Sequence, residues 1–108
     1  MTDTPIPEID VDELAKRQGD GSFVLDVREP DEYAEVHVPG AVLIPLGELP
    51  ARQDEIPEGR PLLVICATGA RSARAVEALR AAGYDASNVV GGTRAWVDAG
   101  FAIAEGAD

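Results

Sequence analysis

The residues best suited to chemistry lie in one short segment that begins at Cys66, the only cysteine of the chain. The segment reads Cys66-Ala67-Thr68-Gly69-Ala70-Arg71-Ser72 and follows an apolar run at residues 62–65. A thiolate is the reactive form of cysteine, and inward backbone N–H groups, a helix N-terminus or a nearby cation lower the thiol pKa. The glycine-containing loop, the helix expected after it and Arg71 offer all three. The pattern therefore predicts an anion-binding loop around a nucleophilic sulfur.

Small side chains dominate this loop. Ala67, Gly69 and Ala70 predict a mouth that is open to a small substrate, with Thr68 between them. We expect Ser72 to cap the following helix. Arg71 has two interpretations, which are binding of an anionic substrate and bracing of the loop against an acidic neighbour. A purely structural cysteine at the end of a core strand is the alternative, but the order strand, cysteine, glycine loop, arginine and helix favours function.

The elements that must position the loop alternate between strand and helix. We expect strands at residues 23–27, 42–44, 62–65 and 88–90, and helices at 11–18, 30–35, 47–56 and 72–82. A last helix, capped by Thr93, ends at Gly100. Crossovers of this length favour a parallel sheet, so the fold class is α/β. Sites in such sheets form beyond the carboxyl ends of the strands, which is where Cys66 falls.

Composition narrows the classes of function. The chain has 108 residues, enough for one domain, which we place at residues 8–104. The single cysteine rules out an intramolecular disulfide, and with a single histidine it is too little for a Cys/His zinc site, so we expect neither metal nor cofactor. A formal net charge of −11 disfavours nucleic acids and anionic membranes as partners. Without a long apolar stretch or a signal-peptide pattern, we expect a cytoplasmic protein.

Motifs outside the loop carry a resemblance to a known family. They are Leu25-Asp26-Val27-Arg28-Glu29, Tyr33, His37-Val38-Pro39-Gly40-Ala41, Ile44-Pro45, Val90-Gly91-Gly92, Trp96 and Gly100. Together with the loop at residues 66–72, they resemble a single-domain rhodanese over nearly the whole chain. One departure is Val36, where the family often has glycine before the motif histidine.

The resemblance implies a three-layer domain with a central, mostly parallel sheet and helices on both faces. It also implies a sulfurtransferase, in which thiosulfate or a persulfide donates its outer sulfur to Cys66 and a thiol or cyanide removes it. A protein donor or acceptor fits as well, and the chief rival is a persulfide carrier dedicated to a partner protein. A phosphatase or arsenate reductase is disfavoured, because those loops have five residues between cysteine and arginine and four intervene here.

Three further residues are candidates for supporting roles. Asp26 is expected to orient loops by accepting backbone hydrogen bonds. Arg28 is more consistent with a structural ion pair than with a substrate ligand, and His37 more with a structural hydrogen bond than with a catalytic base. Trp96 is expected to pack in the core.

Overall fold

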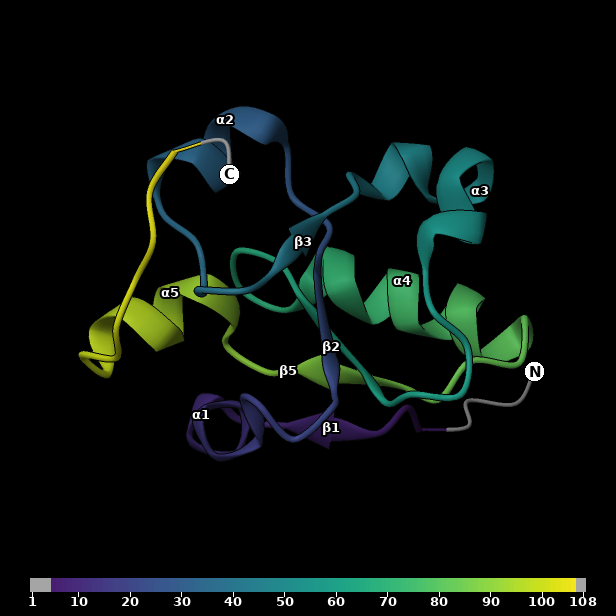
Figure 1. Ribbon diagram of the computed structural model, residues 1–108, viewed down its shortest axis with the longest axis horizontal. Coiled ribbons are helices and arrows are strands. Elements are labelled where there is room, and N and C mark those ends of the chain that lie inside the picture. The colour runs from purple at the N-terminus through teal and green to yellow at the C-terminus, as the bar shows by residue number, and fades with distance from the viewer. Residues whose placement is uncertain (1–4, 107–108) are drawn as a thin grey trace.

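The centre of the molecule is a parallel sheet. The computed structural model describes residues 5–106, and within them five strands lie in the order β1-β5-β4-β2-β3 (Figure 1). All four pairs of neighbouring strands are parallel. The strands are β1 (Glu8–Ile9), β2 (Phe23–Asp26), β3 (Val42–Leu43), β4 (Leu62–Ile65) and β5 (Ala86–Val89). The two-residue edge strand β1 is the one that the sequence pattern did not predict.

Helices cover both faces of this sheet. They are α1 (Val11–Arg17), α2 (Pro30–Glu35), α3 (Leu49–Arg52), α4 (Ala70–Ala81) and α5 (Gly92–Asp98), with short 3-10 turns η1 (Leu46–Glu48) and η2 (Gln53–Glu55) beside α3. One apolar cluster joins the sheet to α3 and α4, and the other joins it to α1, α2 and α5. The predicted three-layer α/β architecture is therefore confirmed.

Strand β4 holds the two clusters together. Leu62, Val64 and Cys66 pack in the cluster with α4, whereas Leu63 and Ile65 pack in the cluster on the opposite face. All four strand residues are buried, and burial of such a side chain contributes roughly 1.5–3 kcal/mol. The strand is consequently among the best anchored parts of the fold, and Cys66 lies directly after it.

Several elements differ from their expected bounds, such as β5 (Ala86–Val89, expected at residues 88–90), and two of the differences have a physical cause. The helix expected at residues 47–56 is divided into η1, α3 and η2. Pro50 explains the division, because it lacks an N–H donor and restricts the residue before it. The helix expected to begin at Ser72 begins at Ala70, for a reason found in the loop itself.

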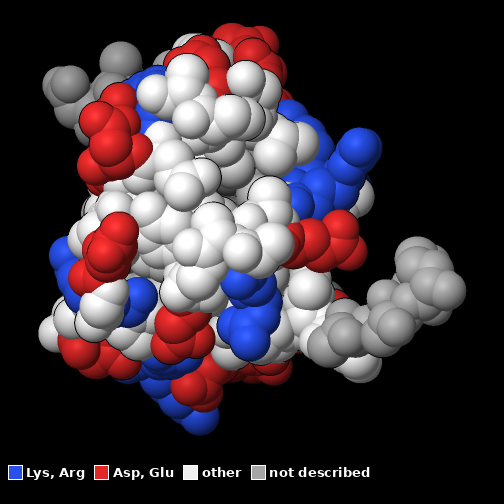
Figure 2. Space-filling view, turned by 90° about the vertical axis from the view of Figure 1, so that its right-hand side faces the viewer, with Lys and Arg blue, Asp and Glu red and all other residues white. Residues whose placement is uncertain are grey.

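The outer surface is strongly charged but not uniformly so. Figure 2 shows a face whose centre is uncharged and whose margin carries acidic and basic side chains.

The longest helix in residues 5–106 is α4, with 12 residues, and none of the helices there has the length and apolar character needed to cross a membrane.

Candidate active site

Cys66 lies between the end of β4 and the start of α4. The turn depends on Gly69, which has φ +113° and forms the N-cap of α4. Residues with a side chain rarely adopt that conformation, so glycine is needed here. The Gly69 N–H donates to the Cys66 Sγ at 3.1 Å.

Ser72 contacts the sulfur rather than capping the helix, so the expected capping role is wrong. Because Gly69 turns the chain early, α4 already begins at Ala70 and Ser72 falls in its first turn. The buried Ser72 Oγ lies 3.3 Å from Cys66 Sγ. The serine thus adds a side-chain donor to the backbone donor from the loop.

Hydrogen bonding outweighs burial at the sulfur. Burial raises the pKa of the Cys66 thiol, whereas hydrogen bonds from Ser72 and from loop backbone groups lower it. The lowering is larger than the rise, so the pKa lies below its ordinary value. The donors are the Ser72 hydroxyl and the backbone N–H groups of Ser72, Gly69 and Thr68. Donors of this kind stabilise the charged form of the group they contact. The sulfur is therefore surrounded by donors of the kind that the prediction of an anion-binding loop requires.

Cys66 is buried although parts of the loop after it are exposed. Thr68 and Ala70 are exposed, but Cys66 itself has 0% relative exposure. The sulfur is therefore not exposed at an open mouth, contrary to the expectation from the sequence.

The start of α5 supports the loop from below. The backbone N–H of Thr93 donates to the Cys66 carbonyl at 2.8 Å, and that of Arg94 donates to the Ala67 carbonyl at 3.1 Å. A Cβ atom on Gly92 would lie 2.6 Å from the Ala67 carbonyl carbon. The expected cap role of Thr93 is wrong, because the N-cap of α5 is Gly91. Gly92 therefore permits a close approach of the α5 backbone to the backbone of the loop.

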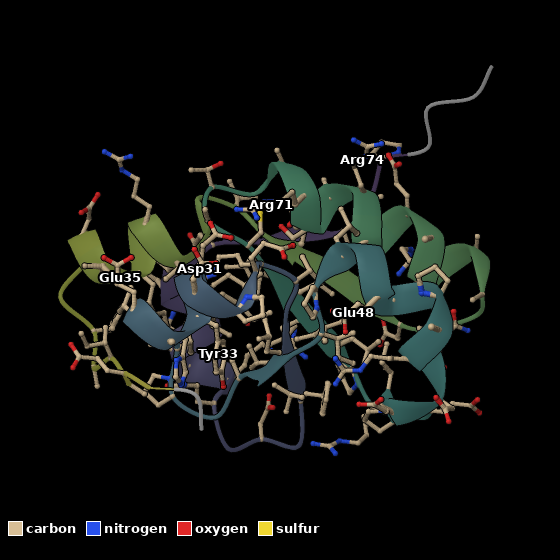
Figure 3. All side chains as sticks on the ribbon, turned by 90° about the horizontal axis from the view of Figure 1, so that it is seen from above. Asp31, Tyr33, Glu35, Glu48, Arg71 and Arg74 are labelled. Carbon is tan, nitrogen blue, oxygen red and sulfur yellow. The ribbon has the colours of Figure 1, made fainter. Side chains whose placement is uncertain are left out.

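Arg71 is held by an acidic residue that the sequence did not identify. Its Nη1 and Nη2 donate to Oε1 and Oε2 of Glu32 at 2.8 and 2.9 Å. The guanidinium lowers the pKa of Glu32 to about 2, and the carboxylate raises the pKa of Arg71. Figure 3 shows Arg71 beside α2, while Arg74, one turn further along α4, lies away from it. Of the two interpretations of Arg71, the structure displays the bracing contact.

Asn88 on β5 is a second residue that the sequence did not identify as part of the site. It is 4% exposed, its Oδ1 accepts from Ser72 Oγ at 2.5 Å and its Nδ2 donates to the Gly69 carbonyl at 3.2 Å. One amide therefore contacts the loop at two points. Asn88 lies in β5, whereas the loop follows β4. No pattern in the sequence around Asn88 indicated that it would contact this loop.

The other candidates lie in a buried network beside the loop. Arg28 Nε donates to both carboxylate oxygens of Asp26, at 3.0 and 3.1 Å, and Nη2 donates to Oδ2 at 2.8 Å. Asp26 also accepts from the Arg28 backbone N–H at 3.0 Å, and Arg28 donates to the Val36 carbonyl at 2.7 Å. Both residues have the structural contacts expected of them.

His37 also makes structural contacts. Its Nδ1 lies 2.7 Å from the Tyr33 carbonyl oxygen, and its ring stacks on Tyr33 with centroids 3.7 Å apart. Its backbone forms a bridge with Ala104. None of these contacts involves Cys66.

A surface pocket lies at the other end of β4. It has a volume of about 470 Å³ and includes Pro61, just before β4, and Gly83 and Tyr84, just after α4. Cys66 follows the carboxyl end of the same strand, so this pocket is separate from the loop. Within residues 5–106 we find no group of three or more His, Cys, Asp or Glu side chains that would hold a metal ion.

Comparisons with known proteins agree with this architecture. A protein from Bacillus subtilis named "Putative sulfur carrier protein YrkF" is 40% identical over 94 residues, which are 84% of this chain and 51% of that protein. The chain thus spans about half the length of this relative. A protein from Allochromatium vinosum named "Sulfurtransferase" is 38% identical over 101 residues, 91% of this chain and 94% of the relative.

This chain is similar to a solved structure over almost the whole length of both chains. The rhodanese-related protein from Thermoplasma volcanium superimposes with a TM-score of 0.86 at 33% identity, covering 91% of this chain and 97% of that one. The sequence profile described as "Rhodanese-like domain" matches residues 10–99. The chain belongs to the rhodanese-like domain family.

Proposed function

We propose that this protein is a sulfurtransferase that carries sulfur as a persulfide on Cys66. The observation that carries the proposal is the set of donors aimed at one sulfur atom, from the Gly69 N–H at 3.1 Å and the Ser72 hydroxyl at 3.3 Å. The name of the Allochromatium vinosum relative, which matches 91% of this chain, supports the same class of reaction.

In the first step, the Cys66 thiolate attacks the outer sulfur of a donor. A new S–S bond forms at Cys66 while the donor's own bond to that sulfur breaks, and the electron pair leaves as sulfite from thiosulfate or as a thiolate from a persulfide. The negative charge then lies on the outer sulfur of the Cys66 persulfide. Inward backbone N–H groups are suited to hold such an anion.

In the second step, a nucleophilic acceptor attacks the outer sulfur. The S–S bond to Cys66 breaks, its electron pair returns to the Cys66 thiolate, and the product is thiocyanate from cyanide or a new persulfide from a thiol. Both steps leave good anionic leaving groups, so neither requires a dedicated general acid. The contacts of His37 with Tyr33 fit a protein that needs no histidine base here.

The charge of the loop affects which sulfur donor it favours. Arg71 is the only charged residue among residues 66–72, and Glu32 compensates it. The loop therefore presents no uncompensated cation to thiosulfate, which is a dianion. Thiosulfate should therefore be compared with a less charged donor, glutathione persulfide, as the source of sulfur.

Dedicated sulfur carriage is the second candidate, because the Bacillus subtilis relative is named as a sulfur carrier. A carrier forms the same Cys66 persulfide but releases its sulfur to a protein partner. Fast loading with slow release to cyanide and small thiols favours this role, whereas rapid turnover with small acceptors favours the sulfurtransferase.

Intact-mass measurement tests the central step. After incubation with thiosulfate or glutathione persulfide, we expect one added sulfur that dithiothreitol removes. Because Cys66 is the only thiol, Cys66→Ser should abolish loading and turnover while circular dichroism remains unchanged. Undiminished sulfur transfer by folded Cys66→Ser protein would rule out the proposal.

A further inference from the structure

The Ser72 hydroxyl faces two acceptors with a single proton. Its oxygen lies 2.5 Å from Asn88 Oδ1 and 3.3 Å from Cys66 Sγ. An amide oxygen and a thiolate both accept hydrogen bonds, and a serine hydroxyl donates only one. The Cys66 thiolate and Asn88 therefore compete for the same proton.

Asn88 cannot leave this competition by turning its amide. Its Nδ2 donates to the Gly69 carbonyl at 3.2 Å, so a flipped amide would place Oδ1 against another carbonyl oxygen. The side chain is 4% exposed, which keeps bulk water from replacing a lost donor. A buried acceptor that loses its hydrogen bond is destabilised. The orientation of Asn88 is thus fixed by the loop that surrounds the sulfur.

We propose that Asn88 is a positioning residue that directs the Ser72 hydroxyl proton toward β5 and so limits its donation to Cys66. With Cys66 as a thiol, the S–H, the Ser72 O–H and Asn88 Oδ1 form one chain of hydrogen bonds. With Cys66 as a thiolate, the Ser72 proton turns to the sulfur and Asn88 Oδ1 loses its donor. Ionisation of Cys66 therefore costs the hydrogen bond from the Ser72 hydroxyl to Asn88 Oδ1.

This competition has a use in sulfur transfer. A thiolate becomes intrinsically more nucleophilic as its pKa rises, and the best attacking thiol has a pKa near the ambient pH. Loop donors alone would stabilise the thiolate and weaken it as a nucleophile. Asn88 offsets part of that stabilisation through Ser72.

Charged groups near Cys66 come from other elements. Arg71 on α4 interacts with both Cys66 and Asp26 and is paired with Glu32 on α2. Asp26, at the end of β2, is itself paired with Arg28. On α5, Arg94 is exposed and meets the loop through its backbone N–H. None of these groups is altered by substitution of Asn88, which is neutral.

A double-mutant cycle separates this role from simple support of the loop. The thiolate absorbance of the only cysteine is titrated in the wild type, Asn88→Ala, Ser72→Ala and the double variant. We expect Asn88→Ala to lower the Cys66 pKa by about 0.5–1 unit, as one competing hydrogen bond is removed. Ser72→Ala should raise the pKa, and adding Asn88→Ala to it should change nothing further.

The opposite pattern would overturn the proposal. If Asn88 only supports Gly69, Asn88→Ala raises the pKa, and does so equally with and without Ser72. The isosteric Asn88→Asp provides a second route, because its rise in pKa should be larger with Ser72 present than in Ser72→Ala. An equal rise in both backgrounds contradicts the role.

Two conditions keep the result interpretable. Ser87→Ala is the matched control, because Ser87 is the preceding residue of β5 and its side chain alternates to the other face of the sheet. It should leave the pKa unchanged. The inference concerns the cysteine of the proposed function, but the titration needs no substrate, so a failure of sulfur transfer and a failure of the Asn88 role are distinguishable.

Discussion

Arg71 and Glu32 form a two-point ion pair that joins the start of α4 to α2. The two N–O distances are 2.8 and 2.9 Å, and the side chains are 36% and 33% exposed. Glu32 is held in place because its Oε1 also accepts from the Glu29 backbone N–H at 2.9 Å, in the capping box of α2. The pair sets both the charge of the loop and its attachment to the neighbouring helix.

Removing either partner should change the KM for thiosulfate in opposite directions. Arg71→Ala leaves the Glu32 carboxylate uncompensated near the loop and should raise KM about fivefold, the effect of roughly 1 kcal/mol from a screened charge. Glu32→Gln frees the guanidinium and should lower KM. Steady-state kinetics measure both, with Arg74→Ala as the control on the same helix. Changes of the same sign in both variants would contradict the electrostatic account.

The same ion pair predicts a loss of stability in acid. The folded-state pKa of Glu32 is about 2, below the ordinary value of 4.5, so its contribution to stability is complete above pH 4.5 and is lost as the pH falls toward 2. The contribution is small, because the pair is about one-third exposed and solvent screens it. In urea unfolding, the free-energy difference between wild type and Glu32→Gln should shrink across this window. A difference that grows as the pH falls would show the wrong sign.

Gly92→Ala should disrupt the support beneath the loop. The new Cβ would overlap the Ala67 backbone, which cannot move away as a flexible side chain could, and φ is +61°. We expect a loss of about 1–3 kcal/mol in the free energy of unfolding together with a loss of sulfur loading.

Gly100→Ala is the matched control for this substitution. Gly100 also has a positive φ, +83°, but an added Cβ would meet nothing within 4 Å. It should cost backbone strain alone and leave sulfur loading intact. Equal losses of loading in the two variants would mean that contact with the loop is not the cause.

Arg28→Met should be strongly destabilising. Asp26 is 0% exposed and Arg28 4% exposed, so the substitution leaves a buried carboxylate without its ionic partner. Breaking such a pair costs about 3–5 kcal/mol. Arg52→Met, which breaks pairs with Glu48 and Glu55 on the surface, should change stability little. Chemical denaturation measures both, and similar losses in the two variants would refute the expected effect of burial.

The sequence alone identified what local patterns encode. Residues 62–65 are apolar at every position, which predicted a buried parallel strand, and the glycine-containing loop after it placed Cys66 at the end of that strand. The helix expected at residues 30–35 was also readable locally, and it is α2 (Pro30–Glu35). Each of these features depends on residues that are near one another in the chain.

The partners of the loop depended on the tertiary structure. Glu32 is 39 residues from Arg71, and Asn88 is 16 residues from Ser72. These contacts exist because β4 lies between β2 and β5 in the sheet, which brings α2 and β5 to the loop. Acidic residues are abundant in the chain, so no local signal distinguishes Glu32 from the others. The nucleophile was thus readable from sequence, whereas the groups that tune it were decided by which strands became neighbours.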